Sequence, residues 1–277
     1  MRPQAFSLSG TGPSMVAWMY GVGHELARSG LLRARGGAPP PRVTGVSGGA
    51  IAALLLATDV DLALDGAFWT LNGENMRRAT KHKELSTRDA MRETLDAVLP
   101  RDAPALASAR AGLTVVAAHG PMRAWPARPP IVIDEFRDRA DLLDAVSASF
   151  HIPFAMDGRA SAPWRGAPHV DAGALGKNLT PVPGAVHVSV LPDRAFAFDR
   201  AAMPAQPAPL RAAVWLAASV MVPCGTRVDV HPWLVQEHAS AAADFLMGNV
   251  PIRVHEERFR RGQEAFHVWA RAEGYLP

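Results

Sequence analysis

The sequence predicts an α/β protein whose central sheet is mostly parallel and is covered by helices on both faces. Short apolar and β-branched runs alternate with longer helical segments along the 277-residue chain, which is typical of parallel sheets. Hydrophobic residues make up 48% of the chain, enough to bury a sizeable core. Because no Ser/Gly-rich linker or charge block divides the chain, we expect one domain over residues 1–277.

The first half of the chain supplies its expected elements in order. A buried strand comes first, followed by a tight glycine turn and a helix that Ser14 caps and Gly30 ends. A β-branched run and an apolar run then give the second strand and its helix. Ser86, three residues before Asp89, forms an imperfect capping box for a later helix. The expected strands are Ala5–Ser9 and Val43–Val46, and the expected helices are Ser14–Arg28, Gly48–Ala57, Asp61–Asn72 and Ser86–Leu99.

The second half continues the alternation. Two strands are expected on either side of a proline-rich excursion, followed by a helix, a short strand end and a buried strand. A long amphipathic helix follows, with Phe259, Phe266 and Trp269 near one face. The expected strands are Leu113–Ala118, Ile131–Ile133, His169–Asp171 and Val186–Leu191, and the expected helices are Ala140–Phe150 and Pro251–Glu273.

The net charge limits which partners the protein is expected to bind, and the cysteine content indicates the compartment in which it works. The formal charge of +3 and the pI of about 9.5 are too weak a basic bias to predict nucleic-acid binding, although they suit an anionic membrane surface. The single Cys224 excludes an internal disulfide and suits a reducing compartment. The longest apolar run, Ala212–Val222, is shorter than the roughly 20 residues of a membrane span, and no leader pattern is visible. We expect a soluble cytoplasmic protein, with a transient peripheral membrane contact left open.

The most informative motif is Gly45-Val46-Ser47-Gly48-Gly49, which lies between an expected strand and an expected helix. A serine on such a turn is held in a strained backbone conformation with its Oγ exposed. The flanking glycines, Gly45 and Gly49, remove Cβ atoms that would clash. The following helix directs its N-terminal amides to the place where an oxyanion would form. This pattern predicts Ser47 as a nucleophile.

A second motif, Leu8-Ser9-Gly10-Thr11-Gly12, follows the first expected strand. Glycines that open a helix present backbone N–H groups to an anion. A phosphate site is one interpretation, but the third glycine and the lysine of nucleotide-binding loops are missing. A plain strand-to-helix turn is another interpretation. With a serine nucleophile in the chain we favour an oxyanion hole, and since Pro13 has no N–H, its donors would be Gly10, Thr11, Gly12 or Gly48.

A third motif, His169-Val170-Asp171-Ala172-Gly173, carries an acid that ends a strand and enters a glycine turn, although an acid on a surface turn is the alternative. Including this motif, four segments of the chain resemble motifs of the patatin-like acyl hydrolases and follow one another in the same order. They are the loop Leu8–Gly12, the elbow Gly45–Gly49, the segment Asp144–Pro153 that ends in Ile-Pro, and Asp171–Gly173, after which Asn178 and Pro181 follow.

The resemblance implies a three-layer α/β/α fold and a Ser-Asp catalytic dyad. Ser47 would be the nucleophile and Asp171 the general base, on a turn that Gly173 completes. Substrates would be lipids or other acyl esters, of the phospholipase A or lysophospholipase kind, with no cofactor and no metal. Because an aspartate with an unperturbed pKa near 4 is a poor base, we expect burial to raise its pKa.

Three departures from the family pattern affect this chemistry. Thr11 replaces a glycine, Pro13-Ser14 stands where the family has an arginine, and Ala172 replaces a second glycine. Ala172 narrows the backbone conformations available at the dyad turn. These departures leave open a catalytically silent protein that binds a lipid or a partner.

A Ser-His-Asp esterase of the α/β-hydrolase type is a further alternative, because a histidine is better matched to neutral pH. In that chain order the histidine must follow the acid. The candidates are His187, His231, His238, His255 and His267. Metal binding is not indicated, because no H-E-x-x-H is present and the acids Asp59, Asp61 and Asp65 lack the partners of a calcium loop. We interpret these acids as a helix start.

The densest basic stretch lies between the nucleophile helix and the next strand. It comprises Arg77, Arg78, Lys81, His82 and Lys83. In an acyl hydrolase such an insertion could form a lid or touch lipid headgroups. A solvated helix face is the commoner origin of such a charge run.

Overall fold

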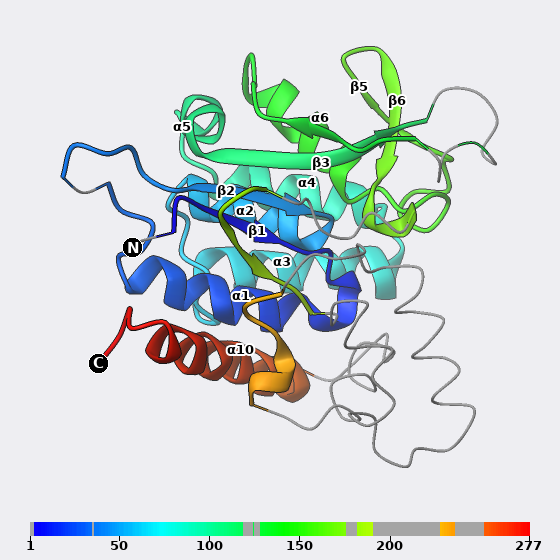
Figure 1. Ribbon diagram of the computed structural model, residues 1–277. Helices are drawn as coiled ribbons and strands as arrows, with labels where there is room; N and C mark the ends of the chain where they lie inside the picture. The colour runs from blue at the N-terminus through cyan, green and yellow to red at the C-terminus, as the bar shows by residue number, and fades with distance from the viewer. Residues whose placement is uncertain are drawn as a thin grey trace.

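The computed structural model describes residues 3–34, 36–118, 124, 128–175, 182–190, 228–235 and 252–277. Within these residues it contains a seven-stranded sheet with seven α-helices around it (Figure 1). The predicted α/β class is confirmed.

The sheet has a parallel part and an antiparallel part. The parallel strands are, in spatial order, β7 (Ala185–Val188), β1 (Ala5–Leu8), β2 (Arg42–Val46) and β3 (Ala111–Ala117). The antiparallel strands are β4 (Ile131–Ile133) and β6 (Ala167–Asp171), which both pair with β3, and β5 (Ala162–Trp164), which pairs with β6. The sheet is therefore mixed. Its parallel strands end at one common edge, and both Ser47 and the loop 9–12 follow strands there.

The core is most protected around β1 and α2 (Gly48–Ala57). Every residue of β1 is buried, and so is every residue of α2 from Gly49 to Ala57. A helix that is apolar on all sides is stable only inside a protein, and α2 accordingly packs on β2 and β3. The observed bounds of α2 are those predicted from the sequence. The segment that follows Ser47 is thus anchored in the core.

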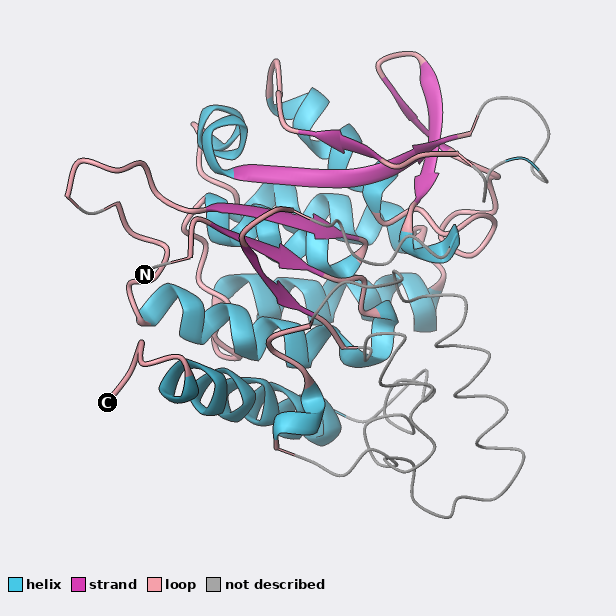
Figure 2. Cartoon of the chain, in the orientation of Figure 1, coloured by secondary structure: helices cyan, strands magenta, loops and turns pink. Residues whose placement is uncertain are grey.

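The remaining helices surround the sheet (Figure 2). They are α1 (Gly12–Arg28), α3 (Ala67–Arg77), α4 (Thr87–Val98), α5 (Ala103–Arg110), α6 (Arg139–Ser149) and α10 (Ile252–Ala272). The capping prediction at α4 is confirmed, because the Asp89 amide donates to the Ser86 Oγ at 3.0 Å. Short helical turns occur at Arg78–His82, Gly173–Leu175 and Pro232–Leu234.

Helices α1 and α10 lie side by side with their backbones in contact (Figure 1). A Cβ atom on Gly21 of α1 would overlap the carbonyl oxygen of Phe259, and a Cβ atom on Gly262 of α10 would overlap that of Trp18. We call this contact, made through Gly21 and Gly262, the glycine seam. It holds the last described helix against the first.

Two predicted helix starts are wrong. Helix α1 begins at Gly12, which lies two residues before the predicted cap Ser14. Its N-cap is Thr11. Helix α3 begins at Ala67, six residues after the predicted start at Asp61. The Asp61 carboxylate instead accepts the Ala63 amide at 2.9 Å, which turns the chain locally and delays the helix.

Two elements are not predicted from the sequence at all. Helix α5 is short and has a proline in its first turn, where the missing N–H costs no hydrogen bond. Strand β5 has only three residues and contains Pro163, which is tolerated because β5 lies at the edge of the sheet.

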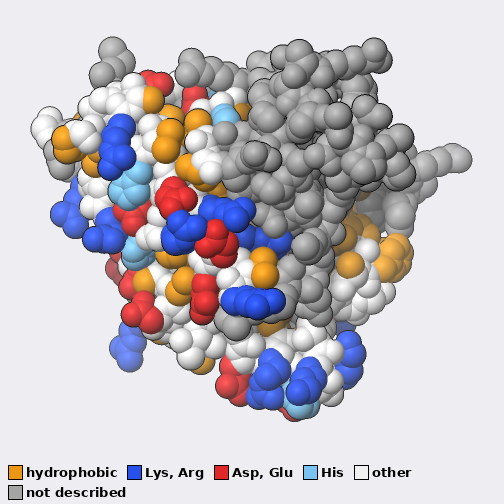
Figure 3. Space-filling model, turned by 90° about the horizontal axis from the view of Figure 1, so that it is seen from below, with side chains coloured by type: hydrophobic (Ala, Val, Ile, Leu, Met, Phe, Trp, Pro, Cys, Tyr) orange, Lys and Arg blue, Asp and Glu red, His pale blue; other side chains and the backbone are white. Residues whose placement is uncertain are grey.

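The described surface near α10 carries charges of both signs (Figure 3, which views the molecule from the α10 side). On this helix Arg260 forms ion pairs with Glu257 and Glu264, and Arg261 pairs with Glu257. Interspersed charges of this kind are typical of a solvated helix face. Across the described ranges, we find no helix whose length and apolar character would let it cross a bilayer.

Candidate active site

Ser47 lies at the turn between β2 and α2, and its backbone φ is +56°. Such a φ is uncommon outside glycine and stores strain. It is the backbone conformation expected of a serine on a strand-to-helix nucleophile turn. Ser47 is also the N-cap of α2, so the amides of the first turn of this helix lie next to its side chain.

The glycines beside Ser47 make this turn possible. A Cβ atom on Gly45 would overlap the carbonyl oxygen of Gly49. A Cβ atom on Gly49 would overlap the carbonyl oxygens of Leu8 and Ser9. The elbow therefore rests directly on the end of β1, where the loop 9–12 begins.

The sheet brings Asp171 to Ser47 from another strand. Val46, at the end of β2, pairs with Thr114 of β3, and the next residue of β3, Val115, pairs with Asp171 of β6. Strands β2 and β6 thus lie on either side of β3, and their ends meet across it. The Ser47 hydroxyl thus lies near the Asp171 carboxylate, where it favours the charged form of that group. Both residues are buried, with 8% and 1% of their surface exposed.

Backbone groups fix Asp171 on both sides. The Gly173 amide donates to its Oδ1 at 2.7 Å, and the Ala174 amide lies near enough to favour the charged carboxylate. The amide of Asp171 itself donates to the carbonyl oxygen of His151 at 3.0 Å. His151 belongs to the Asp144–Pro153 segment, so this motif supports the dyad turn through a main-chain bond. No sequence pattern predicts this contact, because every residue type has a backbone carbonyl.

Burial raises the pKa of Asp171 to about 6. Hydrogen bonds from Ser47, Gly173 and Ala174 favour the charged form and partly oppose this rise. A carboxylate with a pKa nearer to neutrality is a better general base than an unperturbed aspartate. The environment of Asp171 therefore has the property that the sequence-based hypothesis requires.

The altered residues of the family pattern fit the backbone without strain. Thr11 has φ −118° and ψ −14°, whereas the left-handed position with φ +55° falls on Gly12, which is still a glycine. Ala172 does not have a positive φ either. For the amides of Gly10, Thr11 and Gly48, the described residues provide no hydrogen-bond acceptor. These three donors are available to an oxyanion.

The side chain of Thr11 links the loop to the elbow. It is fully buried, and its hydroxyl donates to the Gly12 carbonyl oxygen at 2.9 Å. A Cβ atom on Gly48 would overlap the Thr11 Oγ1, so the threonine side chain lies directly against Gly48. This contact is not predicted from the sequence, and it fixes the spacing between two groups of backbone donors.

The histidines that follow Asp171 lie in other surroundings. His187 lies beside Asp229, His231 precedes the turn Pro232–Leu234, His255 packs on Trp69, and His267 lies 3.3 Å from Glu25. Outside the described residues lie His238, Asn178, Pro181, Cys224 and Ala212–Val222. In the described part of the chain, no histidine side chain is a hydrogen-bond partner of Asp171.

The basic stretch forms ion pairs on a helix face. Arg77 lies 3.3 Å from Glu74, and Arg78 lies 3.0 Å from Glu84 and 2.9 Å from Glu93. These pairs offset much of its charge, which favours the interpretation as a solvated face.

The interpretation of the acids as a helix start is wrong for Asp59 and Asp61, which lie eight and six residues before α3, whereas Asp65 lies two residues before it. Asp59 instead pairs with Arg110, and Asp61 lies 3.5 Å from His24. A search of the described residues finds no cluster of His, Cys, Asp and Glu suited to a metal ion.

Comparison with known proteins adds one finding about this arrangement. A family model described as Patatin-like phospholipase matches residues 6–185, about two thirds of the chain. The match begins in β1 and ends at the start of β7, so it includes the loop 9–12, the elbow and the turn at Asp171. No curated protein sequence matches the chain.

Proposed function

The chain belongs to the patatin-like phospholipase family of lipid acyl hydrolases, and from this premise we propose that it hydrolyses carboxylic esters of lipids through a Ser47–Asp171 dyad. The proposed substrates are esters of the phospholipase A or lysophospholipase kind. The proposed oxyanion hole consists of backbone amides of Gly10, Thr11, Gly12 and Gly48.

The placement of Ser47 beside Asp171 carries the proposal. It brings a serine with a φ of +56° close to a buried carboxylate whose pKa is raised to about 6. A nucleophile in hydrogen-bond contact with its base is the geometry required for covalent catalysis. Neither strain at a serine nor burial of an aspartate benefits folding, and strained, buried groups of this kind gather at active sites.

In the first step, the Ser47 Oγ attacks the ester carbonyl while its proton passes to the Asp171 carboxylate. The carbonyl oxygen becomes an oxyanion, which the amides of the loop and of Gly48 stabilise. Each aligned donor of this kind contributes about 3–4 kcal/mol to transition-state stabilisation. The leaving alcohol then departs with the proton from Asp171, and the acyl group stays on Ser47.

In the second step, Asp171 accepts a proton from a water molecule that attacks the acyl-enzyme. The oxyanion forms again at the same donors, and the fatty acid leaves as Ser47 Oγ recovers its proton. One carboxylate thus acts as base and then as acid in each half of the reaction.

An exposed aromatic residue near the dyad supports a lipid substrate. Phe154 is 56% exposed and has a φ of +64°. It follows His151 by three residues, and the His151 carbonyl holds the Asp171 amide. A large apolar ring held in a strained conformation next to a catalytic turn suits contact with acyl chains or a membrane surface.

The C-terminal helix supports the proposal that residues 1–277 form one domain. Helix α10 lies beyond the matched segment, yet it packs on α1 through the glycine seam. Because α10 covers α1, the first helix of the matched segment, we assign α10 and the matched segment to the same domain.

The test is covalent labelling of the purified protein with a fluorophosphonate probe, followed by peptide mapping. We expect one label, on Ser47, and none in Ser47→Ala, while Ser161→Ala serves as a matched control that still labels. Soluble short-chain esters, lysophospholipids and phospholipid vesicles then rank the substrate classes. A folded protein that takes no label would instead be a catalytically silent lipid- or partner-binding member of the family.

A further inference from the structure

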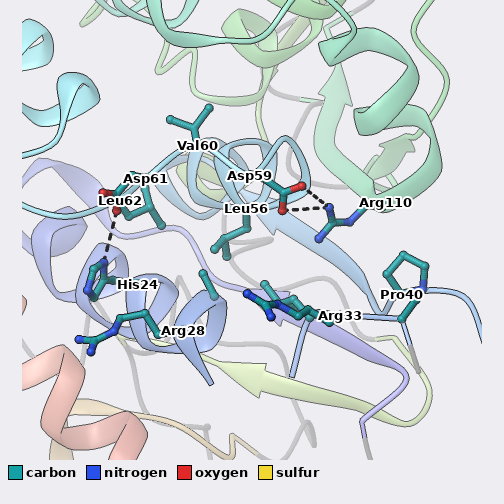
Figure 4. Close-up of a pocket in the computed structure, with 13 residues that line it drawn as sticks. His24, Arg28, Arg33, Pro40, Leu56, Asp59, Val60, Asp61, Leu62 and Arg110 are labelled. Atoms are coloured by element: carbon teal, nitrogen blue, oxygen red, sulfur yellow. Dashed lines mark hydrogen bonds and ion pairs between the residues drawn. The ribbon is translucent and has the colours of Figure 1, made fainter. Parts of the chain in front are cut away.

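A pocket lies at the opposite end of the sheet from Ser47 (Figure 4). It has a volume of about 630 Å³ and lies between the end of α1, residues 32–34, Pro40, the end of α2 and Arg110 at the end of α5. Arg110 directly precedes the amino end of β3 and Pro40 lies two residues before that of β2, whereas Ser47 follows the carboxyl end of β2. A five-residue strand spans about 16 Å, so the pocket is separate from the dyad.

Arg110 offers this pocket an incompletely used guanidinium group. Its side chain is 12% exposed, and its Nη1 donates to both carboxylate oxygens of Asp59, at 3.1 and 3.0 Å. No partner for its Nη2 is found among the described residues. Asp59 has a φ of +55°, so a strained backbone holds the carboxylate in this position.

Arg33 offers a second guanidinium group. Arg33 is exposed, and in the described part of the chain its side chain forms no ion pair or hydrogen bond. In Figure 4, Arg33 and Arg110 lie on one side of the pocket, and His24 and Arg28 lie on the other. Two guanidinium groups on one side of a pocket match the two oxygens of a carboxylate.

The ion pairs around the pocket favour a monoanion. Arg110 pairs with Asp59, and Arg28 lies 3.6 Å from Glu25, so among the described residues Arg33 is the arginine of this pocket that has no ion pair. Helices α1, α2 and α5 all end here, and arginines in the last turns of α1 and α5 offset the partial negative charge of these ends. One unpaired guanidinium group can neutralise the single charge of a carboxylate but not both charges of a phosphate dianion.

The remaining lining suits a hydrocarbon. Leu32, Leu56, Val60 and Leu62 line the pocket between the charged groups. Its volume falls within the roughly 300–1,000 Å³ of pockets that hold small organic ligands.

We propose that this pocket binds an aliphatic carboxylate, with the carboxylate group at Arg33 and Arg110 and the hydrocarbon against Val60 and the leucines. The binding step is independent of the dyad. Where the proposed ester hydrolysis operates, it releases this class of molecule, so the pocket would then take up a product of the protein's own reaction.

The test is calorimetric titration of the full-length protein with octanoate at low salt. We expect saturable binding that Arg33→Gln weakens about tenfold, because the substitution removes a charge-assisted hydrogen bond to the carboxylate. Arg253→Gln, an exposed arginine at the start of α10, is the matched control and should bind as the unaltered protein does. Octanamide, which lacks the charge, should bind at least tenfold more weakly than octanoate.

The variant Asp59→Asn should change the affinity for octanoate in the opposite direction. Asparagine tolerates the left-handed conformation of this position, and the substitution releases the Arg110 guanidinium from its competing carboxylate. Octanoate should therefore bind several-fold more tightly to this variant. Octanoate binding that is absent, that Arg33→Gln leaves unchanged, or that inorganic phosphate exceeds in affinity would overturn the proposal. Unchanged binding in Arg33→Gln would assign the octanoate to the dyad instead.

Discussion

The elbow and the glycine seam both bring two backbones together through glycine, and they differ in what the contact achieves. At the elbow, Gly45 and Gly49 let the turn rest on the end of β1 while Ser47 is held at a positive φ. At the seam, Gly21 and Gly262 let two regular helices approach, and neither glycine has a positive φ. The elbow holds a reactive side chain in a strained conformation, whereas the seam only shortens the distance between helices.

This difference separates two kinds of experiment. Under the proposed function, changes around the elbow should alter catalysis more than stability, because strained groups at active sites serve the reaction at the expense of folding. Changes in the seam should alter the free energy of unfolding and leave the chemistry of the folded protein intact.

The largest effect is expected at the base. Asp171→Asn keeps the shape of the side chain but cannot accept the Ser47 proton, so kcat for ester hydrolysis should fall by roughly 10⁴-fold. Steady-state kinetics on a soluble ester measure this, with folding checked by circular dichroism. Single alanine substitutions at His187, His231, His238, His255 and His267 should each keep substantial activity. A comparable loss at one of these histidines, without unfolding, would replace the dyad with a triad.

The next largest effect is expected in the loop beside the elbow. Thr11→Pro removes one backbone donor and should lower kcat by roughly 10²–10³ with little change in KM, because the contact forms mainly in the transition state. Thr11→Ser keeps both the amide and the hydroxyl that contacts Gly48 and serves as the control. If Thr11→Pro folds normally and keeps its kcat, the Thr11 amide is not a donor, and the oxyanion hole must consist of Gly10, Gly12 and Gly48.

A smaller effect, on stability alone, is expected at the seam. Gly21→Ala or Gly262→Ala places a methyl group against a carbonyl oxygen, and overpacking of this kind costs about 1–3 kcal/mol of unfolding free energy. Urea unfolding measures the loss, and kcat of the folded fraction should not change. Gly73→Ala is the matched control, since its Cβ would meet no atom within 4 Å and alanine favours a helix by about 0.5–1 kcal/mol. Equal destabilisation by all three alanines would show that the seam is not a close contact.

The smallest effect concerns pH. Since the Asp171 carboxylate must be charged to act as base and its pKa is about 6, kcat/KM should fall tenfold per pH unit below about 6. In the folded state this pKa lies above its unfolded value near 3.9, so the stability that the protonated group contributes is lost as pH rises through about 6. Asp171→Asn should thus raise the unfolding free energy at pH 8 by about 1–3 kcal/mol and have little effect at pH 4. A variant that is less stable at pH 8 would contradict the raised pKa.

The sequence predicts best what is decided locally. The bounds of α2 follow from an all-apolar run after a glycine-rich turn, and the cap of α4 follows from Ser86 three residues before Asp89. The start of α3 is missed because the carboxylate of Asp61 bonds to the chain beside it, which competes with helix formation. A three-residue strand such as β5 carries too little periodicity to be recognised.

The candidate residues of the site can be named from the sequence, whereas the contacts between them are harder to predict. Ser47 is recognisable from its own turn, whereas Asp171 needs the pairing of β2 and β6 with β3, which no local pattern reveals. Its assignment therefore came from the order of motifs in a family. The role of the His151 carbonyl and the packing of Thr11 on Gly48 depend on backbone approach, to which side-chain identity gives no access.

The position of α10 has a consequence for synthesis on the ribosome. Helix α1 emerges well before its partner in the glycine seam, which is made more than 220 residues later. At about 5–20 residues per second, this interval lasts on the order of tens of seconds. During it, the face of α1 around Trp18 and Gly21 has no helix to cover it, which makes the nascent chain a candidate for chaperone binding. The contact between α1 and α10 can therefore form only after the whole chain between them has been made.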